Sequence, residues 1–389
     1  MSPWNLVYPE GSAITLLEKE VLFTWKAACW LWSTLAQPSR RKINMKRIGI
    51  LLAGLVFLMA ACRATPEGPK VLTVMTHDSF AISESVVVFF ENENNVDVQF
   101  LEVGDTGTAV NKAALSKGNP LADVFYGVDN TFLSRALEED IFEAYRSPVL
   151  EEIDPVFILD HSYRALPVDF GDVCLNYQIA YFIENDLPAP DSLEDLIHPD
   201  YEDLLTVQNP ATSSPGLAFL MTTVGYYGVD GYLGYWEALV ANGVNIVNDW
   251  ETAYYSAFSQ AGGTDPIVVS YGSSPPFEVL FAEEPLDSAP TAAVTSPGTC
   301  FRQIEFVGIL NGTSNRELAE KWVDFMLSPA FQEDIPLNMY VFPVNDNAVL
   351  EETFQKYLAV PEITADISPD MIAGNREKWI NDWTEAVLR

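Results

Sequence analysis

The first strongly patterned stretch of the chain is residues 71–80, Val-Leu-Thr-Val-Met-Thr-His-Asp-Ser-Phe. Its apolar residues Val71, Leu72 and Val74 predict a buried strand that ends in a polar turn containing His77 and Asp78. In open α/β sheets, ligands bind at the carboxyl ends of strands. We therefore expect a ligand site to include this turn.

Stretches of helical period alternate with short apolar runs after this strand. The pattern predicts helix 83–93, strand 96–103, a helix after residue 108, strand 122–126 and helix 132–139. Strands separated by helices are typical of a mostly parallel sheet that is covered on both faces. Residues 71–167 are thus expected to form a first lobe, completed by about 300–334.

A long extended run at residues 164–177, interrupted by Pro167 and Gly171, suits a crossover between two lobes. Beyond it, we expect helix 192–197, strand 205–207, helices 220–226 and 232–241, strand 244–247, helix 251–260 and strand 266–270. A return strand at 301–310 and an amphipathic helix at 317–327 follow. Residues 168–299, with about 335–389, form the predicted second lobe. The cleft between hinged lobes is the expected binding site.

Residues 45–61 have the composition of a signal peptide, with Lys46 and Arg47 before an apolar stretch and two alanines at its end. Cys62 follows directly, as in a bacterial lipobox, so we expect Cys62 to be lipidated and residues 62–70 to be a tether. An ordinary secretory signal with an incidental cysteine is the alternative. Residues 1–44 are interpreted as a misassigned upstream extension or an unusually long n-region. The expected location is extracytoplasmic and membrane-anchored.

The net charge of −34 excludes an extended basic surface for nucleic acid. The acidic residues are spread along the chain, which is typical of a solubilising surface and tolerates a cationic ligand. The hydrophobic content of 48% is ample for two sizeable cores.

Two cysteines, Cys174 and Cys300, remain once Cys29 and Cys62 are assigned to the leader and the lipid anchor. An even pair in an exported protein predicts a disulfide, and two buried free thiols are the alternative. Cys174 lies in a strand-like run and Cys300 directly precedes another. A bond between them would tie together segments that are distant in sequence.

No catalytic or metal-binding motif stands out, because the three histidines are scattered and no nucleophile elbow or phosphate loop is present. Polar turns do follow several predicted strands, and each offers hydroxyl or backbone N–H groups near a helix start. Taken singly, each turn reads as a helix cap. These turns contain Asp78, Asp105, Thr106, Ser213, Ser214, Tyr271, Gly272, Ser273 and Ser274.

Trp250 stands at the entry of a predicted helix on which Tyr254 and Phe258 share its face. We expect Tyr254 and Phe258 to belong to the core and Trp250 to project into the cleft. An aromatic face stabilises a desolvated cation by about 2 kcal/mol and also stacks on flat heterocycles. This favours a flat, positively charged ligand.

These motifs resemble the thiamine-binding lipoproteins and periplasmic proteins of ABC transporters, within the wider iron and polyamine type of two-lobed binding protein. The resemblance covers essentially all of residues 70–389. It rests on residues 76–80, 122–124, 127–130, 167–171, 209–210, 212–217, 250–254, 270–271, 273–275, 325–326, 328–332, 335–336, 340 and 342–344. Relatives often have tyrosine in place of His77, and some have a tryptophan within the loop 337–340.

The resemblance implies a type II periplasmic-binding-protein fold and a ligand that is thiamine, thiamine monophosphate or thiamine diphosphate. It also implies a permease and a cytoplasmic ATPase as partners. Asp105, Thr106, Ser213, Ser214, Trp250 and Tyr271–Ser274 would contact the ligand, and we add Asp78 as a carboxylate for its charge. We expect a monomer without cofactor, metal or enzymatic activity. The alternatives are a receptor for a polyamine or ferric iron and, further off, a thiaminase-like enzyme.

Overall fold

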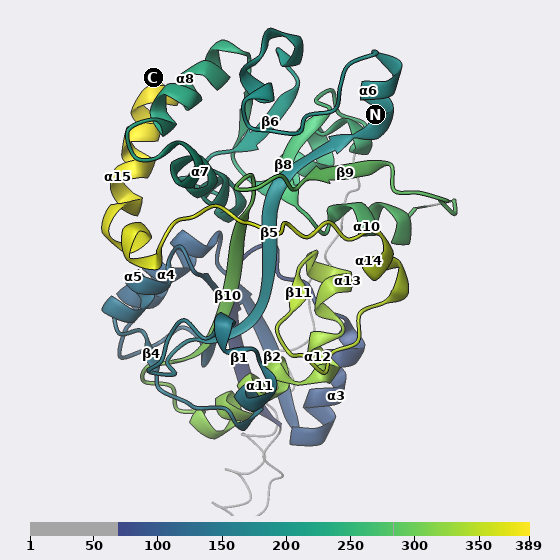
Figure 1. Ribbon diagram of the computed structural model, residues 1–389. Coiled ribbons are helices and arrows are strands. Elements are labelled where there is room, and N and C mark those ends of the chain that lie inside the picture. The colour runs from purple at the N-terminus through teal and green to yellow at the C-terminus, as the bar shows by residue number, and fades with distance from the viewer. Residues whose placement is uncertain (1–68, 283) are drawn as a thin grey trace, which may run out of the picture. The chain divides into compact units, whose positions relative to one another are not determined.

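The computed structural model describes residues 69–282 and 284–389 (Figure 1). The predicted extension 1–44, the signal peptide 45–61, Cys62 and most of the tether 62–70 lie outside the described residues. Within them, no helix has both the length and the apolar composition needed to cross a membrane.

A mixed sheet of eleven strands organises the described residues. The main path runs β2-β1-β3-β10-β5-β8-β6-β7. The strands are β1 (Lys70–Thr76), β2 (Val96–Glu102), β3 (Val124–Asp129), β4 (Phe142–Glu143), β5 (Leu166–Gln178), β6 (Leu205–Gln208), β7 (Asn245–Val247), β8 (Ile267–Tyr271), β9 (Thr291–Val294), β10 (Phe301–Leu310) and β11 (Phe342–Pro343).

The antiparallel strands β5 and β10 run side by side through the middle of the sheet (Figure 1). Parallel strands β2, β1 and β3 lie on the β10 side, and β8, β6 and β7 lie on the β5 side. Both central strands therefore belong to two lobes, which confirms the predicted two-lobed α/β fold with crossover strands. The exact lobe boundaries stay a prediction.

Helices pack against the strands of this sheet. They are α3 (Glu84–Asn94), α4 (Thr106–Leu115), α5 (Leu133–Glu138), α6 (Ile179–Glu184), α7 (Ser214–Tyr227), α8 (Tyr232–Ala241), α9 (Trp250–Thr252), α10 (Ser274–Leu280), α11 (Arg316–Leu327), α12 (Pro329–Gln332), α13 (Ile335–Met339), α14 (Glu352–Tyr357) and α15 (Pro369–Val387). Short 3₁₀ turns lie between them. The prediction of a helix at 192–197 is wrong, since only the 3₁₀ turn Asp195–Ile197 forms there.

Two helices hold the lobes in register. Every residue of α7 from Ser214 to Val224 is buried, because this helix is apolar nearly all round and packs on both central strands. The C-terminal helix α15 inserts Trp383 against Trp236 of α8, and its Arg376 donates to the carbonyl of Thr131 in the first lobe. The chain end therefore contacts both lobes.

Candidate functional site

Asp105 joins the N-termini of two helices that come from different lobes. It is the N-cap of α4, where its Oδ1 accepts a hydrogen bond from the backbone N–H of Gly107 at 3.0 Å. Its Oδ2 accepts from the backbone N–H of Ser214, the first residue of α7, at 2.9 Å. A carboxylate is favoured at a helix N-terminus because unpaired N–H groups point toward it. One side chain thus caps both helices.

The neighbouring hydroxyls extend this contact between the lobes. Ser214 Oγ donates to Thr106 Oγ1 at 3.1 Å, and Thr106 Oγ1 donates to the carbonyl of Gly127 at 2.8 Å. Ser213 caps α7 through the N–H of Gly216. Burial raises the pKa of Asp105, while the hydrogen bonds from Gly107 and Ser214 act in the opposite direction. The structure brings these four predicted residues together at one point.

The turn after β8 carries the next predicted group, Tyr271 to Ser274. Ser274 Oγ lies 2.9 Å from Ser270 Oγ, and Ser273 donates to the backbone carbonyl of Tyr340. Both hydroxyls are fully buried and have partners within the protein. They consequently shape the turn that presents Tyr271.

Gly272 occupies the tightest point of this turn. Its N–H donates to the carbonyl of Asp172 at 2.8 Å, which fastens the turn to β5. A Cβ at this position would lie 2.4 Å from the carbonyl oxygen of Ala359, so any side chain would force the backbone apart. A glycine is required here by packing.

Trp250 belongs to an aromatic cluster that also contains Tyr254, Tyr255, Tyr271 and Tyr340. The Trp250 ring stacks on Tyr254 with 5.1 Å between centroids and contacts Tyr340 edge-on at 5.5 Å. Its Nε1 donates to Ser270 Oγ at 3.0 Å, which fixes the orientation of the indole. Trp250 is half-buried, whereas Tyr254 is buried, as predicted for a core residue. The cluster offers several aromatic faces at the boundary between core and solvent.

The helix predicted at 251–260 is shorter and differently wound. After α9, residues Ala253–Ala257 form a π-helical turn, and the helix ends before Phe258. Such wide turns occur often at functional sites. This turn carries two consecutive members of the aromatic cluster.

A cavity of about 470 Å³ adjoins the aromatic cluster. It is lined by Tyr254, Tyr255, Gln260, Ala261, Phe277, Glu278, Phe281, Ala282, Glu284, Leu286 and Tyr340. Tyr254 donates its hydroxyl to Glu278, whose pKa is raised by burial. The volume lies within the range of about 300–1,000 Å³ that is typical of small-molecule pockets.

Three carboxylates from three adjacent strands lie side by side and define a carboxylate row of Asp129, Glu305 and Asp169. Glu305 of β10 is the register partner of Asp129 in β3 and of Asp169 in β5. All three side chains are buried. Sequence reasoning missed this row as a site, although Asp129 and Asp169 lie in the motifs 127–130 and 167–171.

Hydrogen bonds connect the row to its surroundings. The hydroxyl of Tyr126 lies 2.6 Å from Asp169 Oδ2 and 3.0 Å from Glu305 Oε2, and His77 Nε2 lies 3.4 Å from Glu305 Oε1. Burial raises the pKa of Asp129 to about 6. The ion pair with Glu305 raises the pKa of His77 against the opposing effect of its burial. Among the described residues, no group of three or more His, Cys, Asp or Glu side chains is arranged to hold a metal ion.

Asp78 lies at the edge of this region rather than inside it. Its Oδ1 accepts from the backbone N–H of Gly104 at 2.6 Å, and the side chain is exposed. Asp78 therefore ties the turn after β1 to the turn before α4. A direct role toward a ligand stays a prediction.

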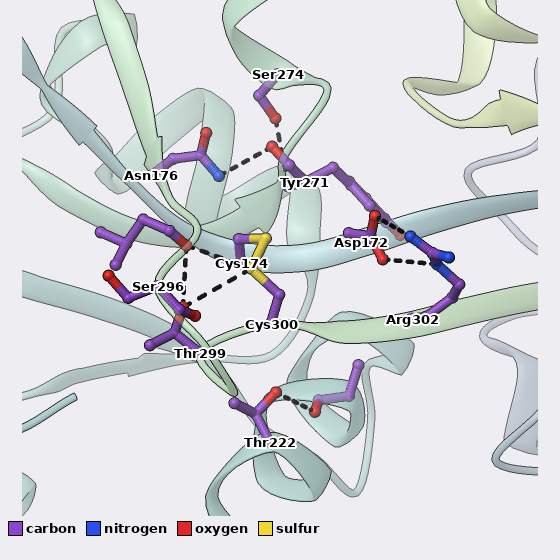
Figure 2. The surroundings of a disulfide bond; sticks show 12 residues. Asp172, Cys174, Asn176, Thr222, Tyr271, Ser274, Ser296, Thr299, Cys300 and Arg302 are labelled. Atoms are coloured by element: carbon purple, nitrogen blue, oxygen red, sulfur yellow. Dashed lines mark hydrogen bonds and ion pairs between the residues drawn. A yellow bond between two sulfur atoms is a disulfide. The ribbon is translucent and has the colours of Figure 1, made fainter. Parts of the chain in front are cut away.

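Cys174 and Cys300 form a disulfide, the first of the two alternatives that the sequence raised. Cys174 of β5 follows Val173, the register partner of Phe301, so the bond joins the two central strands. Figure 2 shows it close to the backbone carbonyl of Tyr271, which accepts from Asn176 Nδ2 at 3.0 Å. The disulfide thus lies beside β8, the strand that precedes the turn of Tyr271, because Cys174 is the register partner of Ser270.

The chain is similar to several known proteins in sequence and in overall structure. A family model described as a bacterial extracellular solute-binding protein matches residues 119–368. The thiamine-binding periplasmic protein of Salmonella typhimurium is 32% identical over 336 residues, which are 85% of this chain and 98% of that protein. The Escherichia coli protein of the same name is 32% identical over 337 residues, with the same coverage of 85% and 98%. The solved structure of a periplasmic thiamin binding protein is 29% identical, with a TM-score of 0.69 over 82% of this chain and 96% of that one.

Proposed function

Since the chain belongs to the family of bacterial extracellular solute-binding proteins, we propose that it captures thiamine between its lobes and delivers it to an ABC transporter. The comparisons confirm the family and the type II fold that the sequence motifs predicted. The protein is located outside the cytoplasm, as its periplasmic relatives are. Two observations support thiamine as the ligand: the relatives are thiamine-binding periplasmic proteins, and the site offers aromatic rings beside buried carboxylates.

The observation that carries the proposal is the aromatic cluster beside the carboxylate row. Thiamine has a flat aminopyrimidine ring and a thiazolium ring with a permanent positive charge. The rings of Trp250, Tyr271 and Tyr340 offer faces for stacking, and Glu305 belongs to a buried row of acids next to Tyr271. Stacking contributes about 1–3 kcal/mol per ring, and a desolvated cation over an aromatic face contributes about 2 kcal/mol.

The remaining end of the ligand would lie toward the paired helix N-termini of α4 and α7. These termini present hydroxyls of Thr106, Ser213 and Ser214, which suit a hydroxyethyl group. Helix N-termini also favour phosphate, so thiamine monophosphate and thiamine diphosphate belong in the test.

The protein is proposed to act as a receptor without chemistry on its ligand. Both cysteines of the described residues are held in the disulfide, so neither is a free thiol nucleophile for a thiaminase-like reaction. We further propose a monomer that is anchored through lipidated Cys62 and contacts a permease with a cytoplasmic ATPase. Closure of the lobes over the ligand would be the state that the permease recognises.

Calorimetry on the fragment 63–389 tests this function, because residues 68–389 form one compact unit. Thiamine, its two phosphates, spermidine and ferric citrate would each be titrated. We expect one-to-one binding of thiamine that is about 30-fold weaker in Trp250→Ala, the equivalent of about 2 kcal/mol. Tyr226→Ala, at a partly exposed aromatic residue near the end of α7, is the matched control and should bind like the wild type.

The alternatives predict different results in the same experiment. Binding of spermidine or ferric citrate without thiamine would assign the receptor to another cation. Thiamine that is recovered as cleaved products after incubation would show an enzyme instead of a receptor.

A further inference from the structure

The carboxylate row has an unusual position for three acids. Directly opposed residues on neighbouring strands point to the same face, with Cβ atoms about 4.5–5.5 Å apart. Asp129 and Asp169 are 0% exposed and Glu305 is 7% exposed. Like charges in such positions repel each other, and burial strengthens the repulsion. The row is therefore unfavourable unless protons or a cation reduce its charge.

The distances around the Tyr126 hydroxyl indicate that the row holds a proton. The hydroxyl of Tyr126 has a single hydrogen, yet its oxygen lies within hydrogen-bond distance of both Asp169 Oδ2 and Glu305 Oε2. Two ionised carboxylates this close would be bridged by one hydrogen against their own repulsion. If one of the two carboxyl groups carries a second hydrogen, that group donates to the Tyr126 oxygen while the Tyr126 hydroxyl donates to the other carboxylate. All three oxygens then take part in a hydrogen bond. Burial and the charge of Glu305 raise the pKa of Asp169, whereas His77 and the hydrogen bonds to Glu305 lower the pKa of Glu305 against the effect of its burial, so the proton is assigned to Asp169.

One buried acceptor of the row is left over. Asp169 Oδ1 has no hydrogen-bond partner among the described residues, although it is fully buried. An unpaired buried carboxyl oxygen costs free energy, and an approaching positive charge removes that cost.

The row faces the aromatic cluster. A Cβ at Gly171 would lie 2.8 Å from Cδ1 of Tyr271, so the tyrosine ring covers Gly171. Asp169 is two residues earlier in β5 and thus lies on the same face of the strand. The charges of the row act on the Tyr271 hydroxyl and raise its pKa together with burial. A ring stacked on Trp250 and Tyr271 is therefore next to the row.

The titratable groups around the row come from every element packed against it. They are His77 and Asp78 after β1, Asp105 at the start of α4, Tyr126 and Asp129 of β3, Asp169 of β5, Tyr271 of β8 and Glu305 of β10. His77 is the basic side chain that contacts the row, and it pairs with Glu305. Because His77 pairs with Glu305, Asp169 has no cationic side chain as a partner among the described residues.

We propose that Asp169 and Glu305 form the subsite for the positive charge of the ligand, and that the bound cation displaces the proton that this pair shares. The proton leaves to the solvent, and the two carboxylates then face the cation of the ligand and His77. This inference rests on the proposed function and adds that capture of the ligand is coupled to proton release.

Calorimetry of the fragment 63–389 in several buffers measures the coupling. The observed binding enthalpy is plotted against the ionisation enthalpy of the buffer, and a negative slope gives the number of protons released per ligand bound. At a pH of about 8 Asp129 is ionised, because its pKa is about 6. We expect thiamine to release about one proton. Deazathiamine, in which an uncharged thiophene ring replaces the thiazolium, should release none.

Two variants separate the subsite from general effects of buried acids. Asp169→Asn should abolish proton release and weaken thiamine binding about tenfold, because the variant cannot ionise. Asp160→Asn removes another buried carboxylate, which accepts from Ser162 and Arg164 away from the row, and it should bind and release protons like the wild type. If Asp169→Asn does not fold, the wild-type comparison of thiamine with deazathiamine decides by itself.

The failures are distinguishable. Two results overturn the inference and leave the proposed function standing. In the first, thiamine binds without releasing a proton; in the second, thiamine and deazathiamine release the same number of protons. Thiamine that does not bind overturns the proposed function and this inference with it.

Discussion

Asp105→Asn separates two roles that one carboxylate performs. Asparagine caps a helix about as well as aspartate does, so the variant keeps the cap of α4. It has one acceptor oxygen, however, and cannot accept from both Gly107 and Ser214 as the carboxylate does at 3.0 and 2.9 Å. The link to the N-terminus of α7 is therefore the interaction that the variant loses.

The magnitude follows from the kind of bond that is lost. A hydrogen bond to a charged group contributes about 1.5–3 kcal/mol, and Asp105 is only partly exposed. Since the link joins the two lobes, we expect its loss to weaken the closed form that the proposed function assigns to the bound ligand. We expect thiamine to bind roughly 10- to 150-fold more weakly to Asp105→Asn. Unfolding of the ligand-free protein should change little, because α4 keeps its cap.

Calorimetry for thiamine and thermal unfolding without ligand are the two assays. Ser214→Ala is the control, because it keeps the N–H group that donates to Asp105 and loses only the hydroxyl contacts to Asp105 at 3.3 Å and to Thr106 at 3.1 Å. Its binding should fall by less than about fivefold, the effect of a net hydrogen bond of about 1 kcal/mol. Wild-type affinity in Asp105→Asn, or a loss of thermal stability as large as the loss of affinity, would refute the reasoning.

Two further predictions concern stability. The double variant Cys174→Ala, Cys300→Ala opens a loop with a sequence separation of 126 residues, so urea unfolding should show a loss of about 2–5 kcal/mol with thiamine affinity retained; a loss below about 1 kcal/mol contradicts this. Asp129 binds its proton more tightly when the protein is folded, because burial raises its pKa to about 6 from the ordinary value of 3.8. The contribution of Asp129 to the free energy of unfolding is therefore greatest below pH 3.8. It falls by about 3 kcal/mol as the pH rises to about 6. Denaturation midpoints of the ligand-free protein should drop over this range, and the drop should shrink in Asp129→Asn; an equal drop in both proteins would assign it to other groups.

Much of the architecture was predictable because it depends on local pattern. The first strand, the central strand at 301–310 and the helices at 83–93 and 317–327 form close to their expected positions. Tyr254 and Phe258 are buried as their spacing from Trp250 predicted.

The turns that hold Asp105 and Ser213 were also predictable, because polar residues at helix starts are recognisable in the sequence. The contact between these two turns was not predictable. The bond from Ser214 to Asp105 spans 109 residues of chain, and only the packing of α7 across the central strands brings the two helix starts together.

The aromatic cluster shows the same limit. The position of Trp250 at a helix entry predicts a role in the cleft, whereas Tyr340 enters the prediction only as one of the residues of the family resemblance. Tyr340 has a left-handed backbone with φ of 61° at the end of α13, and this turns the chain toward Trp250. The π-helical turn that carries Tyr255 has no signal in the apolar pattern either.

The sequence by itself determined the order of strands and helices along the chain and the polar turns, because each depends on residues within a few positions of one another. It also predicted the two lobes, from the crossover strand, and the disulfide, from the even pair of cysteines. The tertiary structure alone decided the carboxylate row. Asp129, Asp169 and Glu305 come from three strands, and only the register of β3, β10 and β5 sets them side by side. Strand register depends on contacts between distant segments, and a shift by one residue would turn these side chains to the opposite face.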